Sequence, residues 1–137
     1  MDKRISDKIN QIENFLSDLI KYRPDSLEDY EQKNDKKAIC ERYLEKIIEA
    51  MVDLAFLVVK EKRLDIPDSD MAAFDILEKN KVINSNLADR LKEARGMRNI
   101  LIHQYGEIDD TIVFEVVHNE IEKDAEEFLE NVKKSFN

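Results

Sequence analysis

Glycine and proline are scarce in this chain, which has two of each among its 137 residues. Hairpin turns depend on these residues, so their scarcity argues against an all-β fold. The longest unbroken apolar run, Leu54–Val59, is far too short to cross a bilayer, which argues against a membrane protein. The chain is instead rich in Ala, Leu, Glu, Lys and Ile, which favour helices. We therefore expect an all-α fold.

Cysteine is almost absent as well. Cys40 is the only one, so no disulfide can form within the chain, and a reducing compartment is indicated. No apolar run follows Met1–Ser6, so the sequence shows no signal peptide. We expect a cytoplasmic protein in which Cys40 is a small core residue.

Acidic residues outnumber basic ones by 31 to 22, and the net charge of −9 argues against general binding to nucleic acid. The charge is uneven, however. Residues 87–105 hold four basic residues against two acidic ones, whereas residues 107–130 hold ten acidic residues against one basic residue. The first segment could admit RNA, and we assign RNA binding to its Arg90, Lys92 and Arg95. The second segment could dock a basic partner, although such a run is usually a solvated helix face.

Apolar residues spaced three or four apart predict the helices. One stripe, from Ile5 to Leu19, ends before Pro24, because the residue before a proline is pushed out of the α region. A capping box over residues 26–29 opens a second helix, whose first turns are polar and weak. Candidate N-caps for three further helices are Ser69, Asn84 or Ser85, and Asp109 or Asp110. The pattern predicts an antiparallel bundle of four to five helices that forms a single domain over residues 1–137.

One stretch, Arg98–Gly106, concentrates residues that can carry chemistry. It holds one of the two histidines, which titrates near neutral pH, and an arginine whose permanent charge suits phosphate. In a regular helix Arg98 falls within the apolar stripe that contains Ala94 and Leu101. Spacing alone supports two readings equally. In the first, Arg98 has a functional role; in the second, Arg98 pairs with an acidic residue while Tyr105 packs at the helix end.

His103 lies five residues after Arg98, which is about 140° around a regular helix. The two side chains would then point apart. For them to act together, the helix must end or distort near Ile102, or the site must form across a dimer.

The pattern Arg98, four residues, His103, one residue, Tyr105 resembles the motif of the HEPN superfamily and, more closely, of the HepT-like ribonuclease toxins. Asn99 matches the polar residue that often follows the arginine in that group. The motif also precedes a final acidic helix, as it does there, and the resemblance covers nearly the whole chain.

This resemblance implies a homodimeric, HEPN-like bundle that acts as a metal-independent endoribonuclease, without a cofactor, and as the toxin of a toxin–antitoxin pair. Arg98 and His103 would be catalytic and Asn99 supporting, with the 2′-OH of RNA as the nucleophile. The implied partner is a minimal nucleotidyltransferase antitoxin of the MntA type, which would transfer AMP to Tyr105 and so block the site.

Two other functions stay open from the sequence. The first is a non-catalytic module that binds a nucleotide or phosphate and assists a nucleotidyltransferase. The second is a purely structural bundle, in which replacing Arg98 would damage stability rather than activity.

Other candidate residues carry weaker signals. His118 lies among acidic residues and is expected at the surface. Pairs of aspartates at helix starts lack the histidine and carboxylate spacing of a metal site, so no metal is predicted. Tyr22, Tyr30 and Tyr43 are scattered along the chain and predict no stacking platform of the kind that single-strand binders use.

Overall fold

The computed structural model of the chain describes residues 1–103 and 109–137, and the side chains of residues 1–101 and 109–137. Within these ranges every regular element is a helix, which confirms the predicted all-α class. The elements are α1 (Lys3–Tyr22), α2 (Leu27–Gln32), α3 (Asn34–Glu61), α4 (Asp70–Lys79), α5 (Ser85–His103), α6 (Asp110–Glu115), the π-helical segment η1 (Val116–Glu120) and α7 (Ile121–Ser135). None of the described helices is both long and apolar enough to span a bilayer.

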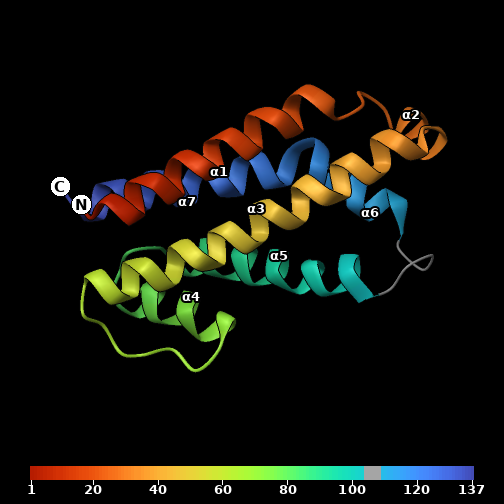
Figure 1. Cartoon of the computed structure of the whole chain (residues 1–137). Helices are drawn as coiled ribbons and strands as arrows, with labels where there is room; N and C mark the ends of the chain where they lie inside the picture. Colours follow the sequence, from red (N-terminus) through yellow and green to blue (C-terminus); the bar gives the residue numbers. More distant parts are fainter. Residues whose placement is uncertain (104–108) are drawn as a thin grey trace.

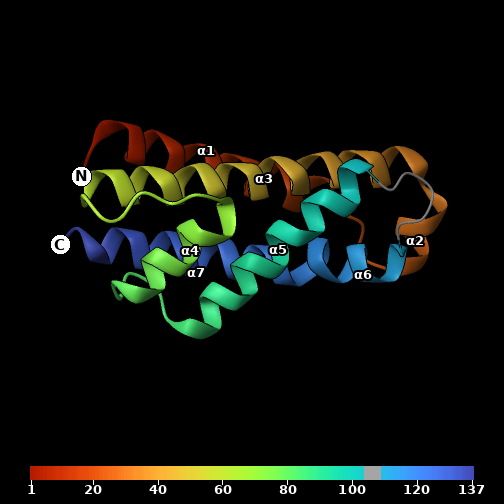
Figure 2. The same cartoon turned by 90° about the horizontal axis from the view of Figure 1, so that it is seen from below.

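The long helices form the predicted antiparallel bundle. α1 lies along α3, and α4 packs against α3 and α5 on the other side (Figure 1). α7 contacts α1, α3 and α5, and so closes the bundle (Figure 2). The start of α3, the helices α2 and α6, and the end of α5 all lie toward the end of the bundle opposite the two termini (Figures 1 and 2).

A single cluster of buried side chains forms the core and draws on every helix. The predicted stripe of α1 is at most 5% exposed at each of its positions, Ile5, Ile9, Ile12, Leu16 and Leu19. Burying one such aliphatic side chain fully contributes about 1.5–3 kcal/mol, so this cluster dominates the stability of the bundle. Cys40 is fully buried in it, as predicted.

The N-cap side chains accept hydrogen bonds from backbone N–H groups two or three residues further on. The predicted caps and their bond lengths are Ser26 at 3.2 Å, Ser69 at 3.1 Å, Asn84 at 2.8 Å and Asp109 at 2.9 Å. Each cap satisfies a backbone donor that the helix itself leaves open, which is worth about 1 kcal/mol. Asp2 caps α1 in the same way through the N–H of Arg4 at 2.7 Å, and the sequence analysis missed it.

The predicted second helix is split in two. Lys33, at φ −109° and ψ 87°, leaves the helical region and separates α2 from α3. The cause lies in Tyr30, which is fully buried and packs its ring 5.8 Å from that of Phe114 on α6. One straight helix could not both seat Tyr30 against α6 and run along α1, so the polar turn around Lys33 breaks.

The predicted last helix is continuous but contains one wide turn. The N–H of Ile121 donates to the carbonyl of Val116, five residues back, which defines the π-helical segment η1. The buried positions Val113, Val117, Ile121 and Ala125 follow three successive steps of four residues. In a helix of 3.6 residues per turn, each step of four residues exceeds one full turn, so such a stripe drifts around the helix axis. The wider π-helical turn compensates for this drift and keeps the stripe facing the core.

Candidate functional site

Arg98 lies on α5 beside the buried side chains of Ala94 and Leu101, as its spacing predicted. Its Nη2 atom is 3.6 Å from Oε1 of Glu49 on α3, and its side chain is 23% exposed. Among the described residues, no acceptor bonds to its buried Nε atom. Because 3.6 Å exceeds an ordinary hydrogen bond, the guanidinium of Arg98 is held loosely.

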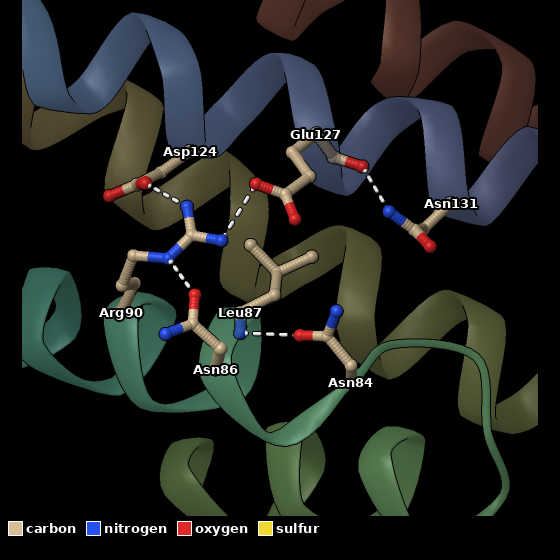
Figure 3. A network of polar contacts seen from close by, with 7 residues as sticks. All are labelled: Asn84, Asn86, Leu87, Arg90, Asp124, Glu127 and Asn131. Atoms are coloured by element: carbon tan, nitrogen blue, oxygen red, sulfur yellow. Dashed lines mark hydrogen bonds and ion pairs between the residues drawn. The ribbon is translucent and has the colours of Figure 1, made fainter.

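Arg90, two turns earlier on α5, is held much more tightly. Its guanidinium donates to Asp124 at 2.5 Å and to Glu127 at 2.7 Å, and its Nε donates to Asn86 at 2.8 Å (Figure 3). Although burial lowers the pKa of Arg90, the two carboxylates outweigh it and raise that pKa above the ordinary value. These contacts favour a structural role for Arg90, clamping α5 to α7.

Two more cations of α5 face α4. Nε of Arg95 donates to Asp70 at 2.6 Å, and Nζ of Lys92 donates to Asp75 at 2.7 Å. The hydrogen bond to Asp75 raises the pKa of Lys92. The basic segment predicted to bind RNA is therefore largely neutralised within the chain, and among its four cations Arg98 lies farthest from its nearest carboxylate.

A small cavity of about 180 Å³ opens beside Arg98. Its lining consists of Glu49, Val52, Asp53, Asp70, Arg95 and Arg98, from α3, α4 and α5. Two guanidinium groups and three carboxylates thus border one hollow, and Arg95 is already bonded to Asp70. The structure therefore brings Arg98 and Arg95 together without an excess of positive charge.

Asn99 is exposed and accepts a hydrogen bond from Nη1 of Arg95 at 3.0 Å. α5 stays helical through His103, its last residue, so no break at Ile102 turns the backbone at position 103 toward position 98. α5 nevertheless ends one residue after Ile102, so cooperation at the helix end and assembly across a dimer both stay predictions. The side chain of His103 and the whole of Tyr105 lie outside the described residues.

Two of the three tyrosines that are scattered along the sequence lie together in the fold. The rings of Tyr22 on α1 and Tyr43 on α3 stack, with centroids 6.2 Å apart and planes 10° apart. Phe15 adds a third ring, 6.4 Å from Tyr43. The two tyrosines are distant in sequence, but the antiparallel pairing of α1 and α3 places them together.

His118 is exposed, as predicted, and stacks on Phe114 at 5.0 Å. Burial raises the pKa of the Cys40 thiol to about 11, so this cysteine stays protonated near neutral pH and is no nucleophile. In the part of the chain that the structure describes, no group of three or more His, Cys, Asp or Glu side chains is placed to hold a metal ion.

Sequence reasoning missed the acidic partners of the four α5 cations. Glu49, Asp70 and Asp75 lie on other helices, so no local spacing joins them to α5. The only available signal was the burial cost of Arg98, which predicted that a partner exists without naming it.

Comparison with known proteins shows that the chain matches a protein family. A family model described as ribonuclease HepT-like matches residues 5–132. Among curated proteins, the mRNA nuclease HepT of Shewanella oneidensis is 37% identical over 90 residues, which cover 66% of this chain and 67% of that protein. The tRNA nuclease HepT of Aphanizomenon flos-aquae is 29% identical over 110 residues, covering 80% and 75%.

A solved structure resembles the whole fold. It is a tri-AMPylated HEPN toxin of Shewanella oneidensis in complex with an MNT antitoxin. The two folds superpose with a TM-score of 0.90 at 30% identity, over 98% of this chain and 99% of that one.

Proposed function

The chain belongs to the HepT-like ribonuclease family, and on that premise we propose that it is the RNA-cutting toxin of a toxin–antitoxin pair, with Arg98 and His103 as its catalytic residues. It is an endoribonuclease with a HEPN-like fold. The cytoplasm, where RNA substrates and a reduced Cys40 occur together, is the proposed location.

The loose contact of Arg98 carries the proposal. A guanidinium 3.6 Å from one exposed carboxylate has little to lose when it turns to a phosphate. Arg95 shares its cavity, and Lys92 lies one turn before Arg95 on α5. To contact the RNA backbone, each would have to exchange its aspartate, Asp70 or Asp75, for a phosphate. The firm contacts of Arg90 suit a different task, which is to hold α5 in place.

The chemistry needs only these residue types. RNA brings its own nucleophile, the 2′-OH, which attacks the adjacent phosphorus and expels the 5′-oxygen. His103 can accept the proton of the 2′-OH or donate one to the leaving oxygen, and Arg98 can stabilise the charge that grows on the phosphate oxygens. Asn99, on the same helix, would orient the phosphate. No step requires a metal ion.

A homodimer would bring Arg98 of one chain toward His103 of the other. Gly96 lies about 200° around α5 from Arg98, so a contact at Gly96 would join two chains through the face opposite Arg98. A side chain added at Gly96 would meet nothing within 4 Å, so nothing in the described chain explains a glycine there. Glycine costs a helix interior about 1 kcal/mol relative to alanine. Ile100, one turn on and 38% exposed, offers an apolar neighbour on the same face. A second α5 packed close at Gly96 would account for the glycine and for the exposed Ile100.

The proposed partner is a minimal nucleotidyltransferase antitoxin that transfers AMP to Tyr105. The solved toxin resembling this chain is itself AMPylated and bound to an MNT antitoxin. AMP on Tyr105 would add bulk and negative charge a few residues from Arg98, which would repel an RNA phosphate.

The test is cleavage of a total RNA pool by the purified, partner-free homodimer in excess EDTA. Mass spectrometry first checks that Tyr105 carries no AMP. We expect cutting by the wild type, none by Arg98→Ala or His103→Ala, and unchanged cutting by Arg4→Ala, which removes an exposed arginine at the other end of the bundle. If an unmodified, folded dimer cuts no RNA, the proposed nuclease function is wrong and a non-catalytic phosphate-binding module is favoured.

A further inference from the structure

A cluster of three aromatic rings and two lysines lies on the surface formed by α1 and α3. We call it the tyrosine platform, and it consists of Phe15, Lys21, Tyr22, Tyr43 and Lys46. Tyr22 is 38% exposed, and the rings of Phe15 and Tyr43 are half-buried. Phe15 and Tyr43 pack against the core with part of each ring exposed, so the open surface of the platform lies mainly at Tyr22.

The lysines of the platform sit over its rings. Nζ of Lys46 is 5.6 Å from the ring centroid of Phe15 and 5.7 Å from that of Tyr43. Nζ of Lys21 is 5.4 Å from the centroid of Tyr22. Exposed contacts of this kind are weak, about 0.5–1 kcal/mol, so either lysine can lift away when a stronger anionic partner arrives.

The platform lies close to Arg98. Glu49, the carboxylate beside Arg98, is three residues after Lys46 on α3. Residues three apart on a helix are neighbours, roughly 5–6 Å between their Cβ atoms. Arg42, which is 64% exposed and one turn before Lys46, adds another positive charge and pairs with Glu45 at 3.5 Å. Cations and carboxylates thus alternate along α3 from Glu49, beside Arg98, back to Arg42.

We propose that the tyrosine platform holds the single-stranded RNA that flanks the cleavage point, an inference that rests on the proposed nuclease function. A base stacks on the open part of the Tyr22 ring, which Tyr43 supports from behind. Lys46, Lys21 and Arg42 then contact phosphates. Aromatic rings interleaved with cations are the combination that binds single strands without strict sequence preference.

The chemistry favours RNA over a protein partner on this surface. A protein that covered the rings would have to desolvate Lys21 and Lys46 and then pair them. An RNA strand supplies flat bases for the rings and one phosphate per nucleotide for the cations, so both kinds of group find a partner at once.

The test measures binding rather than cutting. Fluorescence anisotropy of the His103→Ala homodimer, which leaves RNA intact, reports its affinity for a labelled unstructured RNA of roughly 15 nucleotides. Tyr22→Ala should weaken this binding about tenfold, within the range for one base–aromatic stack. Tyr22→Phe keeps the ring and should bind as the parent does. Tyr22→Leu keeps an apolar side chain for packing, so it serves if the alanine variant unfolds.

Two controls assign the loss to stacking on this surface. Lys46→Gln should weaken binding severalfold, whereas Lys60→Gln, the same charge change at the far end of α3, should have no effect. A strand of equal length with abasic flanks should bind the Tyr22→Leu variant and its parent equally.

Three results would overturn the platform. One is unchanged RNA affinity in the folded Tyr22→Leu variant. Another is an equal loss on the abasic strand. The third is loss of antitoxin binding with RNA affinity intact, which would make the surface a protein contact. The binding assay does not depend on cleavage. A wild type that cuts no RNA would therefore contradict the proposed nuclease function, while the anisotropy measurements would still test whether the platform binds RNA.

Discussion

Glu49 is the one described carboxylate within 4 Å of the guanidinium of Arg98, at a distance of 3.6 Å. Its own side chain is 53% exposed, so the pair is solvated and weak. Glu49 therefore competes with any phosphate that approaches Arg98 without neutralising Arg98 firmly.

Replacing Glu49 by Gln should raise kcat/KM for RNA by about two- to fivefold, the factor that corresponds to losing one exposed ion pair. The measurement is cleavage rate at low substrate concentration. Glu61→Gln changes the charge identically at the other end of α3 and should leave the rate unchanged. A fall in the rate of the Glu49 variant would instead show that this carboxylate assists the reaction.

The clamp between α5 and α7 should matter for stability. Arg90→Met leaves the Asp124 side chain, which is 12% exposed, without its cation. The expected loss of unfolding free energy is about 2–3 kcal/mol, somewhat below the range for fully buried pairs because Arg90 keeps some contact with solvent. Urea unfolding would measure it. Lys134→Gln removes an exposed pair with Glu130 on α7 and should cost under about 0.5 kcal/mol.

Gly96→Ala separates folding from assembly. The added methyl group meets nothing in the chain and removes a helix-breaking residue, so the monomer should gain about 0.5–1 kcal/mol. The same methyl should weaken a dimer in which a second α5 packs there, which sedimentation over a range of concentrations would show. Asn10→Ala on α1 gives a comparable gain in helix propensity away from α5. A dimer of undiminished strength in the Gly96 variant would place the interface elsewhere.

Glu41 should make the protein less stable as the pH rises through its folded-state pKa. Burial, together with the nearby Asp110, raises the pKa of Glu41 above its ordinary 4.5, although Lys37 opposes this. A raised pKa means that the folded state holds the proton more tightly, so the stabilisation is complete below pH 4.5 and disappears above the folded pKa. Glu41→Gln should therefore melt higher than the wild type at pH 7 and alike at pH 4. Equal melting curves at both pH values would contradict this assignment.

Local patterns predicted much of the fold. The α1 stripe and the caps at Ser26 and Ser69 follow from spacing and from backbone chemistry within a few residues. The break at Lys33 did not follow, because its cause, the contact between Tyr30 and Phe114, joins segments far apart in sequence.

In the candidate site, too, local spacing predicted some features, whereas others depend on contacts between distant segments. Spacing placed Arg98 within the apolar stripe of α5 and required a partner for it, but the identity of Glu49 depends on how α3 and α5 pack. Tyr22 and Tyr43 form a stacked pair only because α1 and α3 run antiparallel with one particular offset. Geometry of this kind is set by the whole core and leaves no local trace.

The wide turn at η1 gives the last helix one residue more than an unbroken α-helix would need over the same path. Its closing bond reaches five residues back, whereas an α-turn reaches four, so removing one residue from η1 lets the turn close as α and leaves α7 in place. Asp124 and Glu127 would then keep their contacts with Arg90. Deleting the exposed His118 is therefore expected to leave the protein folded, whereas deleting the exposed Lys123 within α7 would rotate the rest of that helix by about 100° and unfold it, a contrast that two melting curves would reveal.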